Sequence, residues 1–238
     1  YLKYCGVRSL DYVFISHPDK DHVNGIYELI ELCDNTFEIG TVVLPGISRA
    51  AAVKKQADDD MSKLERIFKN AGINVVYADA GDCIKSGGFS VKCMHPCEGY
   101  DYESANDYSA VYLVEYGDFS MLMTGDAEKK AEKCIIEDVN SMAGDAGEPA
   151  RLASVNILKV GHHGSKGASS EEFLSYVKPE NALISCGAGN SYGHPHTETL
   201  QRLSGIGAKV YRTDESGEIA VRVRDCSYKI EVFKALKG

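Results

Sequence analysis

The stretch Ile15-Ser16-His17-Pro18-Asp19-Lys20-Asp21-His22-Val23-Asn24-Gly25 decides how this chain is interpreted. It follows a short apolar run at residues 12–15, which predicts a buried strand. Imidazole nitrogens and carboxylate oxygens are ligands that zinc, manganese and iron accept in proteins. The stretch therefore predicts a loop, closed by a glycine, that gathers four side chains around a metal centre: His17, Asp19, Asp21 and His22.

Further polar residues follow later predicted strands. Asp126 ends a Thr-Gly-Asp sequence, His162 and His163 lie in Gly-His-His-Gly-Ser, and His194 follows Asn190 by four residues. Six of the seven histidines lie in these segments or in the first stretch. Because loops at one edge of a sheet are the usual place for a site in an α/β scaffold, we expect these side chains to meet.

In this order the motifs resemble those of the metallo-β-lactamase fold, and specifically the hydrolase domain of the ComEC family of DNA-uptake channel proteins. Residues 17–22 are similar to the family's first motif, with Asp19 where most of the superfamily has histidine. Asp126 matches the carboxylate that bridges two metals. Residues 106–109, Asn-Asp-Tyr-Ser, resemble the N-D-x-S element. The late motifs are matched by residues 162–165 and 190–195.

The resemblance implies a single domain over residues 1–238 with an αββα sandwich of two mixed sheets flanked by helices. The pattern of the residues alone indicates an α/β protein. Relatives have two or more strands before the first motif, whereas this chain opens on Tyr only eleven residues before its first predicted strand. We therefore expect the first strands of the fold to be missing from the chain.

The expected elements alternate in the second half of the chain. The expected helices cover residues 25–32, 50–70, 127–139, 169–177 and 197–204. The expected strands after the first cover residues 41–44, 74–78, 89–94, 111–116, 120–124, 155–160, 182–185, 209–212, 218–224 and 227–233. Residues 142–151 are expected to form a mobile connector.

The resemblance also implies two divalent ions, zinc or manganese, that activate a hydroxide between them. In this arrangement His17 and Asp19 bind one ion, Asp21 and His22 bind the other, and Asp126 bridges the two. The carboxylates shift the preference towards manganese.

Two assignments stay open at this point. Either His162 or His163 completes the second ion; we prefer His163, with His162 beside the phosphate or the leaving oxygen. The third ligand of the first ion is Asn106 or His95.

Three candidate catalytic and three candidate substrate-binding residues follow. The catalytic candidates are Asp21, His162 and His194. The substrate-binding candidates are Ser165, Lys166 and Asn190. A hydroxyl, backbone N–H groups and a cation before a predicted helix suit an anionic substrate. A helix cap with a surface lysine is the alternative for Ser165 and Lys166.

These residues predict a metal-dependent hydrolase of phosphodiester bonds. In the ComEC-like case it is a nuclease that cuts one strand of incoming DNA, outside the cytoplasm and attached to a membrane channel of the same parent protein. The alternatives are a cytoplasmic phosphodiesterase for small esters such as a phosphocholine ester, and a catalytically silent domain that binds DNA or a partner. The oligomeric state stays open.

Charge and cysteine content qualify these predictions. The net charge of −9 disfavours a nucleic-acid partner, but residues 151–238 hold 12 basic and 9 acidic residues. No run approaches the roughly 18 apolar residues that a membrane helix needs. The eight cysteines are dispersed, which favours free thiols in a reducing environment. Cys93 and Cys97 flank His95, which is interpreted as either a metal site or two ordinary cysteines.

Overall fold

The structure is a computed structural model. It describes residues 2–31, 37–46, 52–97, 99, 101–102, 104–142, 152–224 and 227–233. Of the predicted connector, residues 143–151 lie outside the described residues.

The N-terminal half of the fold consists of a three-stranded parallel sheet, which forms one layer, and two helices, which form a second layer. The sheet order is β1 (Ser9–Phe14), β2 (Glu38–Pro45) and β3 (Asn74–Ala78), and the connections are α1 (Lys20–Glu31) and α2 (Ala52–Asn70). Parallel neighbours need such crossovers, and both helices pack on one face of the sheet. The apolar cluster that joins them includes Val23, Val42, Leu44, Leu64 and Phe68.

The second sheet has seven strands in the order β10-β9-β8-β7-β6-β5-β4. Its antiparallel part is β4 (Cys83–Ser86), β5 (Phe89–His95), β6 (Val111–Tyr116) and β7 (Phe119–Met123). Its parallel part continues from β7 to β8 (Ile157–Lys159), β9 (Asn181–Ile184) and β10 (Lys209–Arg212). The sheet is therefore mixed.

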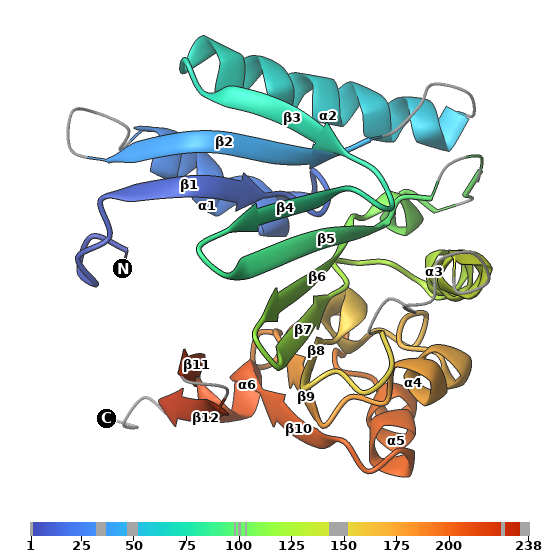
Figure 1. Cartoon of the computed structure of the whole chain (residues 1–238). Coiled ribbons are helices and arrows are strands. Elements are labelled where there is room, and N and C mark those ends of the chain that lie inside the picture. Colours follow the sequence, from blue (N-terminus) through green and yellow to red (C-terminus); the bar gives the residue numbers. More distant parts are fainter. Residues whose placement is uncertain are drawn as a thin grey trace.

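Helices α3 (Lys129–Met142), α4 (Glu171–Val177) and α5 (Thr197–Gly205) pack on one face of this second sheet. The two sheets meet through a cluster that includes Val43, Ala78 and Tyr112. The result is two sheets between outer helices, as expected for the sandwich (Figure 1). No described helix is both long and apolar enough to cross a lipid bilayer.

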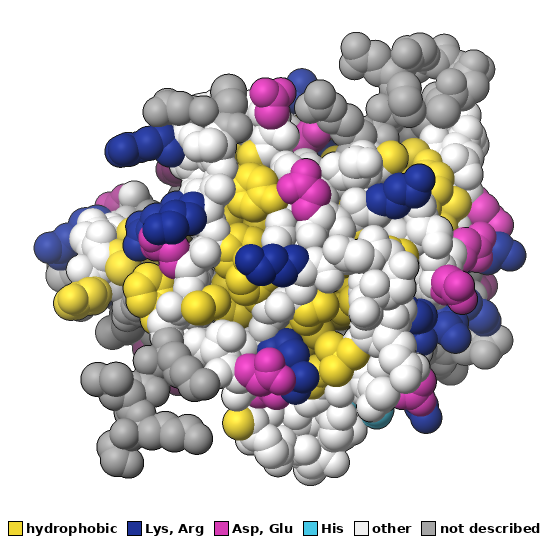
Figure 2. All heavy atoms as spheres, turned by 90° about the horizontal axis from the view of Figure 1, so that it is seen from below, with side chains coloured by type: hydrophobic (Ala, Val, Ile, Leu, Met, Phe, Trp, Pro, Cys, Tyr) yellow, Lys and Arg dark blue, Asp and Glu magenta, His cyan; other side chains and the backbone are white. Residues whose placement is uncertain are grey.

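A C-terminal hairpin of β11 (Glu218–Arg224) and β12 (Ser227–Phe233) follows the short helix α6 (Thr213–Ser216). Its apolar side chains pack against Phe119, Ile157 and Leu183 of the second sheet. From below, apolar side chains gather in the middle of the molecule with charged residues among and around them, and histidine is visible only towards the lower edge (Figure 2). The histidine-rich loops therefore do not open onto this face.

The predicted ends of the elements differ most at α1. This helix begins at Lys20 and not at residue 25, so Asp21 and His22 lie in its first turn. The carbonyl of Asp19 accepts hydrogen bonds from the N–H groups of His22 and Val23. A carboxylate in the first turn is stabilised by the helix dipole. The prediction of a loop up to Gly25 was therefore wrong from Lys20 onward, because the apolar periodicity from which the helix was predicted does not extend to its first turn.

Strand β4 and helix α6 were not predicted. Both are four residues long, and β4 has an exposed or half-exposed surface, so neither has a readable apolar pattern. The strands at residues 74–78, 209–212, 218–224 and 227–233 were predicted with the observed bounds.

Candidate metal centre

His17 lies immediately after β1 and is 2% exposed. The Ser16 hydroxyl is 3.1 Å from its Nδ1, and its Nε2 lies 3.8 Å from Oδ2 of Asp126 and 3.9 Å from Oδ2 of Asp19. Burial, together with the charge of His22, lowers the pKa of His17 to about 4. A neutral imidazole offers the lone pair that a metal ligand needs.

Asp126 follows β7 and is buried beside four of the histidines. Its Oδ1 is 3.2 Å from Nε2 of His22, and its backbone N–H donates to the Ser109 hydroxyl. Burial alone would raise the pKa of Asp126, but the close contact with the imidazole of His22 and the charge of His17 hold it well below its usual range. Gly125 has φ +51°, and a Cβ there would lie 2.8 Å from Cβ of Ser16. The end of β7 can approach the end of β1 because this residue is glycine.

His163 faces the same point from the end of β8. Its Nδ1 is 2.8 Å from the carbonyl oxygen of Ser185, so this nitrogen carries the proton. Its Nε2 is 3.0 Å from Oδ2 of Asp21 and 3.3 Å from Nε2 of His22. A backbone carbonyl that fixes the tautomer of a histidine is a common feature of metal ligands.

The His162 ring lies between two carboxylates, with Nδ1 towards Glu128 and Nε2 towards Asp126. Its Nδ1 is 3.0 Å from Oε1 of Glu128 and 3.4 Å from Nδ2 of Asn106, while its Nε2 is 3.8 Å from Oδ2 of Asp126. His162 and His163 have φ of +46° and +53° in the short helix η2 (Gly161–Gly164). Non-glycine residues adopt this left-handed conformation at a cost, and such positions cluster at functional sites.

The donor set fits a metal. Nε2 of His17 and Oδ1 of Asp126 are buried without a hydrogen-bond partner among the described residues. Leaving such atoms unpaired costs about 1–3 kcal/mol each, which a bound cation would offset. At this centre two groups have ligand atoms within 4.8 Å of one another: His17, His22 and Asp126, and Asp21, His22 and His163. Possible metal sites are therefore present, and His22 belongs to both.

The structure brings the predicted ligands together with one rearrangement. His17 groups with His22 and Asp126, while Asp19, whose side chain is 57% exposed, is 3.9 Å from His17. Burial and the nearby carboxylates Asp21 and Asp126 raise the pKa of Asp19. Which ligand serves which ion stays a prediction.

His95 is placed in the interior, away from a ligand role. Its Nδ1 is 2.8 Å from the carbonyl oxygen of Ser109, and its Nε2 is 2.7 Å from the hydroxyl of Tyr102. Both nitrogens are thus already hydrogen-bonded. Of the two residues considered for the third ligand of the first ion, Asn106 is the one that contacts the centre, through His162.

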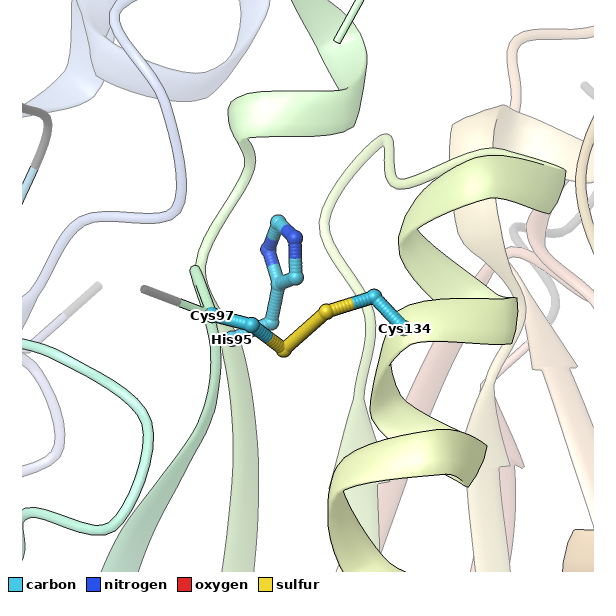
Figure 3. A group of neighbouring side chains, drawn as sticks. All are labelled: His95, Cys97 and Cys134. Atoms are coloured by element: carbon cyan, nitrogen blue, oxygen red, sulfur yellow. A yellow bond between two sulfur atoms is a disulfide. The ribbon is translucent and has the colours of Figure 1, made fainter. Parts of the chain in front are cut away.

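A disulfide joins Cys97, after β5, to Cys134 of α3, with His95 beside it (Figure 3). The prediction of free thiols was wrong for this pair, because spacing along the chain carries no information on the 37-residue loop that the fold closes. The Cys93 thiol is buried and donates to the carbonyl of His95. The sulfur atoms of Cys97 and Cys134 are bonded to each other, which disfavours a metal site around His95.

The candidate substrate-binding residues are largely engaged in holding loops. The Ser165 side chain is buried, and its hydroxyl accepts the N–H of Gly167. Lys166 is exposed, and its backbone N–H donates to His196. Asn190 hydrogen-bonds both backbone groups of His194. Their roles towards a substrate stay predictions.

The ring of His194 lies beside both histidines of η2, with centroids 5.5 Å from His162 and 6.2 Å from His163. Burial, and the charges of the neighbouring histidines, lower its pKa. His194 therefore stands at the edge of the centre.

Glu128 is the contact that sequence reasoning missed. It follows Asp126 by two residues and lies just before α3, and its N–H donates to the buried carboxylate of Asp107. The visible signal was a second carboxylate directly after the Thr-Gly-Asp motif. The contact with His162, 34 residues further along, depends on the fold.

The chain matches no family model. It is 30% identical over 220 residues, 92% of its length, to ComE operon protein 3 of Bacillus subtilis (strain 168). It is also 30% identical to Recombination protein 2 of Haemophilus influenzae and to competence protein ComA of Neisseria gonorrhoeae, over 95% and 92% of its length. The chain spans about a quarter of the length of these relatives (25%, 24% and 26%).

Among solved structures, CmlA, a diiron β-hydroxylase from Streptomyces venezuelae, is similar with a TM-score of 0.59 at 15% identity. The match covers 86% of this chain and 44% of that one. The metallo-β-lactamase fold protein YhfI from Bacillus subtilis gives a TM-score of 0.49 at 11% identity over 85% of this chain and 75% of that one. The order of the motifs, the layered sheets and the three sequence relatives agree: the chain belongs to the ComEC-type competence protein family and has the metallo-β-lactamase fold.

Proposed function

We propose that the chain hydrolyses phosphodiester bonds of single-stranded DNA with two divalent ions, zinc or manganese, held by the histidine and aspartate centre. The observation that carries this proposal is the pair of orphaned buried atoms, Nε2 of His17 and Oδ1 of Asp126, within a cluster of metal-ligating side chains. Such atoms are explained by a cation that both would contact.

The exposure of the carboxylates supports catalysis over a purely structural site. The side chains of Asp19 and Asp21 are 57% and 62% exposed, whereas those of His17 and Asp126 are 3% and 6% exposed. One side of the cluster is therefore accessible to solvent, while structural zinc sites are closed by four protein ligands. When bound, two such ions would polarise a phosphoryl oxygen and acidify a water molecule.

The residues around the ligands have defined roles in this proposal. Asp21, His22 and His163 would hold one ion, and His17 and Asp126 would hold the other with Asp126 shared. Glu128 accepts the Nδ1 proton of His162, which leaves Nε2 of His162 to contact the phosphate or to exchange a proton with the leaving oxygen.

Two of the relatives are named a recombination protein and a competence protein, and this supports DNA as the substrate. The basic balance of residues 151–238 agrees with a polyanion. In a parent protein of the relatives' length, the domain would cut one strand while a channel domain takes up the other, on the extracytoplasmic side.

The test is cleavage of end-labelled single-stranded DNA and of bis-(p-nitrophenyl) phosphate by the metal-stripped chain after addition of Mn²⁺ or Zn²⁺. We expect metal-dependent cleavage by the wild type and none by Asp126→Asn. Asp118→Asn, in an exposed hairpin turn between β6 and β7, is the matched control and should retain full activity.

Each other outcome has a defined meaning. Cleavage of the small ester with intact DNA would replace the nuclease with a small-molecule phosphodiesterase. Tight metal binding without cleavage of either substrate would favour a silent binding domain. Activity that survives in Asp126→Asn would exclude this centre as the site.

A further inference from the structure

Tyr192 lies beside the metal centre, and its side chain is 77% exposed. Its ring stacks on His194, with 5.7 Å between centroids and 23° between planes. His194 in turn lies nearly parallel to His163, at 6.2 Å and 20°. A column of three near-parallel rings thus runs from a candidate metal ligand to solvent and ends on the open face of Tyr192.

The loop that presents Tyr192 is fixed by Asn190. The Asn190 amide donates to the carbonyls of Gly187 and His194, and its Oδ1 accepts the N–H of His194. These three bonds close the turn on both sides of Tyr192. The backbone that carries the ring is therefore held in place before any ligand arrives, which lowers the entropy cost of binding.

We propose that Tyr192 is a stacking platform for an unpaired nucleobase of the strand whose backbone enters the metal centre. This inference rests on the proposed function and names the part of the substrate that the site recognises beyond the phosphate. A single exposed tyrosine is common on protein surfaces, but this one stacks on His194, whose ring lies beside His163, and this links it to the site. Every base has a π-face, so such a platform accepts any sequence, whereas bases within a duplex have their faces covered.

The position of Tyr192 predicts which kinetic constant it affects. The ring of His194 already stands between Tyr192 and His163, so the stacked base belongs to a nucleotide that flanks the attacked phosphate. The contact forms on binding and is the same in the transition state. Loss of the ring should therefore raise KM for single-stranded DNA and leave kcat unchanged.

The test uses the absence of tryptophan from the chain. Tyr192→Trp places one indole on the platform, so its emission reports the site alone. The probe is a nuclease-resistant phosphorothioate oligothymidylate of about 12 nucleotides, a length within the usual single-strand site size, with Mn²⁺ present. Its abasic counterpart carries the same backbone without bases.

We expect the thymidylate to quench the emission of Tyr192→Trp and the abasic strand to leave it unchanged. Tyr192→Ala should bind the thymidylate about 10-fold more weakly than the wild type and the abasic strand with unchanged affinity. Tyr4→Ala, which removes a ring that is 91% exposed near the N-terminus, is the control and should bind both strands like the wild type.

Unchanged emission at saturating thymidylate, or wild-type affinity of Tyr192→Ala, would overturn the proposal. Cleavage of DNA is measured separately from base stacking, so the failure of the proposed nuclease activity can be distinguished from the failure of the stacking proposal. Quenching without cleavage under any metal would leave the stacking platform in place and remove the nuclease, whereas cleavage with no effect of Tyr192 would do the reverse. A wild-type chain that binds neither strand would overturn both.

Discussion

Two regions of the molecule share one arrangement and use it differently. The segments β1-α1-β2-α2-β3 and β8-α4-β9-α5-β10 are both parallel strands joined by helices, and in each the first strand is followed by residues of the candidate metal centre. The first region supplies His17, Asp19, Asp21 and His22, partly from the first turn of a helix. The second supplies His162 and His163 from a left-handed backbone.

The difference lies in how the ligands are held. Asp19 and Asp21 are exposed side chains, whereas His162 and His163 are each fixed through Nδ1 by Glu128 or by the carbonyl of Ser185. The centre thus combines adaptable carboxylates from one region with fixed imidazoles from the other. Asp126, from the strand between them in the fold, contacts both sets.

The largest effect is expected from removing one ligand in each region. His22→Ala and His163→Ala should both reduce turnover of single-stranded DNA to the metal-free background, because their Nε2 atoms lie 3.3 Å apart in one cluster. Steady-state rates at saturating Mn²⁺ measure this. If either variant keeps wild-type turnover, the two regions do not build one centre.

Replacing two motif glycines, Gly164 and Gly25, by alanine should change the free energy of unfolding in opposite directions. A Cβ at Gly164, where φ is +84°, would lie 2.6 Å from Cβ of Pro195, so Gly164→Ala should lower the free energy of unfolding by about 2–4 kcal/mol. Gly25 lies inside α1 with open space around it, so Gly25→Ala should raise that energy by about 0.5–1 kcal/mol. Urea unfolding measures both. Equal changes in unfolding free energy would contradict the inference that Gly164 has a left-handed backbone with no room for a Cβ while Gly25 is helical with open space around it.

The side chains that orient His162 and His17 should differ in how much their loss reduces activity. Glu128→Gln should lower the rate of DNA cleavage by about 10- to 100-fold, because the carboxylate fixes His162 and strengthens its basicity. Ser16→Ala, which removes the hydroxyl 3.1 Å from Nδ1 of His17, should cost less, since a neutral partner gives a weaker hydrogen bond. Steady-state rates of DNA cleavage at saturating Mn²⁺ distinguish the two variants. A larger loss for Ser16→Ala would reverse the comparison.

A smaller change in the free energy of unfolding is expected when pH alters the protonation of the buried histidine His95. Burial lowers the pKa of His95 to about 4 from 6.5, so between these values the unfolded chain binds a proton that the folded chain does not. The stability that neutral His95 contributes is therefore full above pH 6.5 and is lost as pH falls towards 4, by up to about 1.4 kcal/mol per pH unit. The difference in unfolding free energy between the wild type and His95→Gln should shrink accordingly.

The same burial lowers the pKa of His17 to about 4, but His17 lies in the metal centre. We therefore expect Mn²⁺ to change how the difference in unfolding free energy between the wild type and His17→Gln depends on pH. The pH dependence of the same difference for His95→Gln should be unaltered by Mn²⁺. Unfolding curves at several pH values, with and without Mn²⁺, test this. An equal response of both variants to the metal would place His95 in the centre.

The sequence was sufficient for the fold family and for the side chains that meet. Ordered motifs at strand ends carry this information, because parallel strands bring their carboxyl ends to one edge. The start of α1 was missed because Asp19, a residue type that favours the N-terminus of a helix, was interpreted only as part of a metal-binding loop. Short elements such as β4 were missed because pairing with a neighbour, and not their own pattern, stabilises them.

Long-range partners were beyond the reach of sequence reasoning. Glu128 contacts His162 across 34 residues, and Cys97 joins Cys134 across 37. The choice between His95 and Asn106 also needed the fold, because only the hydrogen bonds of His95 to Ser109 and Tyr102 reveal a core histidine.

The central claim is that both regions share one metal centre bridged by Asp126, and the number of bound ions tests it most directly. Mn²⁺ binding to the metal-stripped chain would be counted by calorimetry and by electron paramagnetic resonance, which detects coupling between ions about 3.5–4 Å apart. The account predicts two coupled ions per chain in the wild type and loss of the coupled pair in Asp126→Asn. No stoichiometric binding, or a coupled pair that persists without the Asp126 carboxylate, would contradict it.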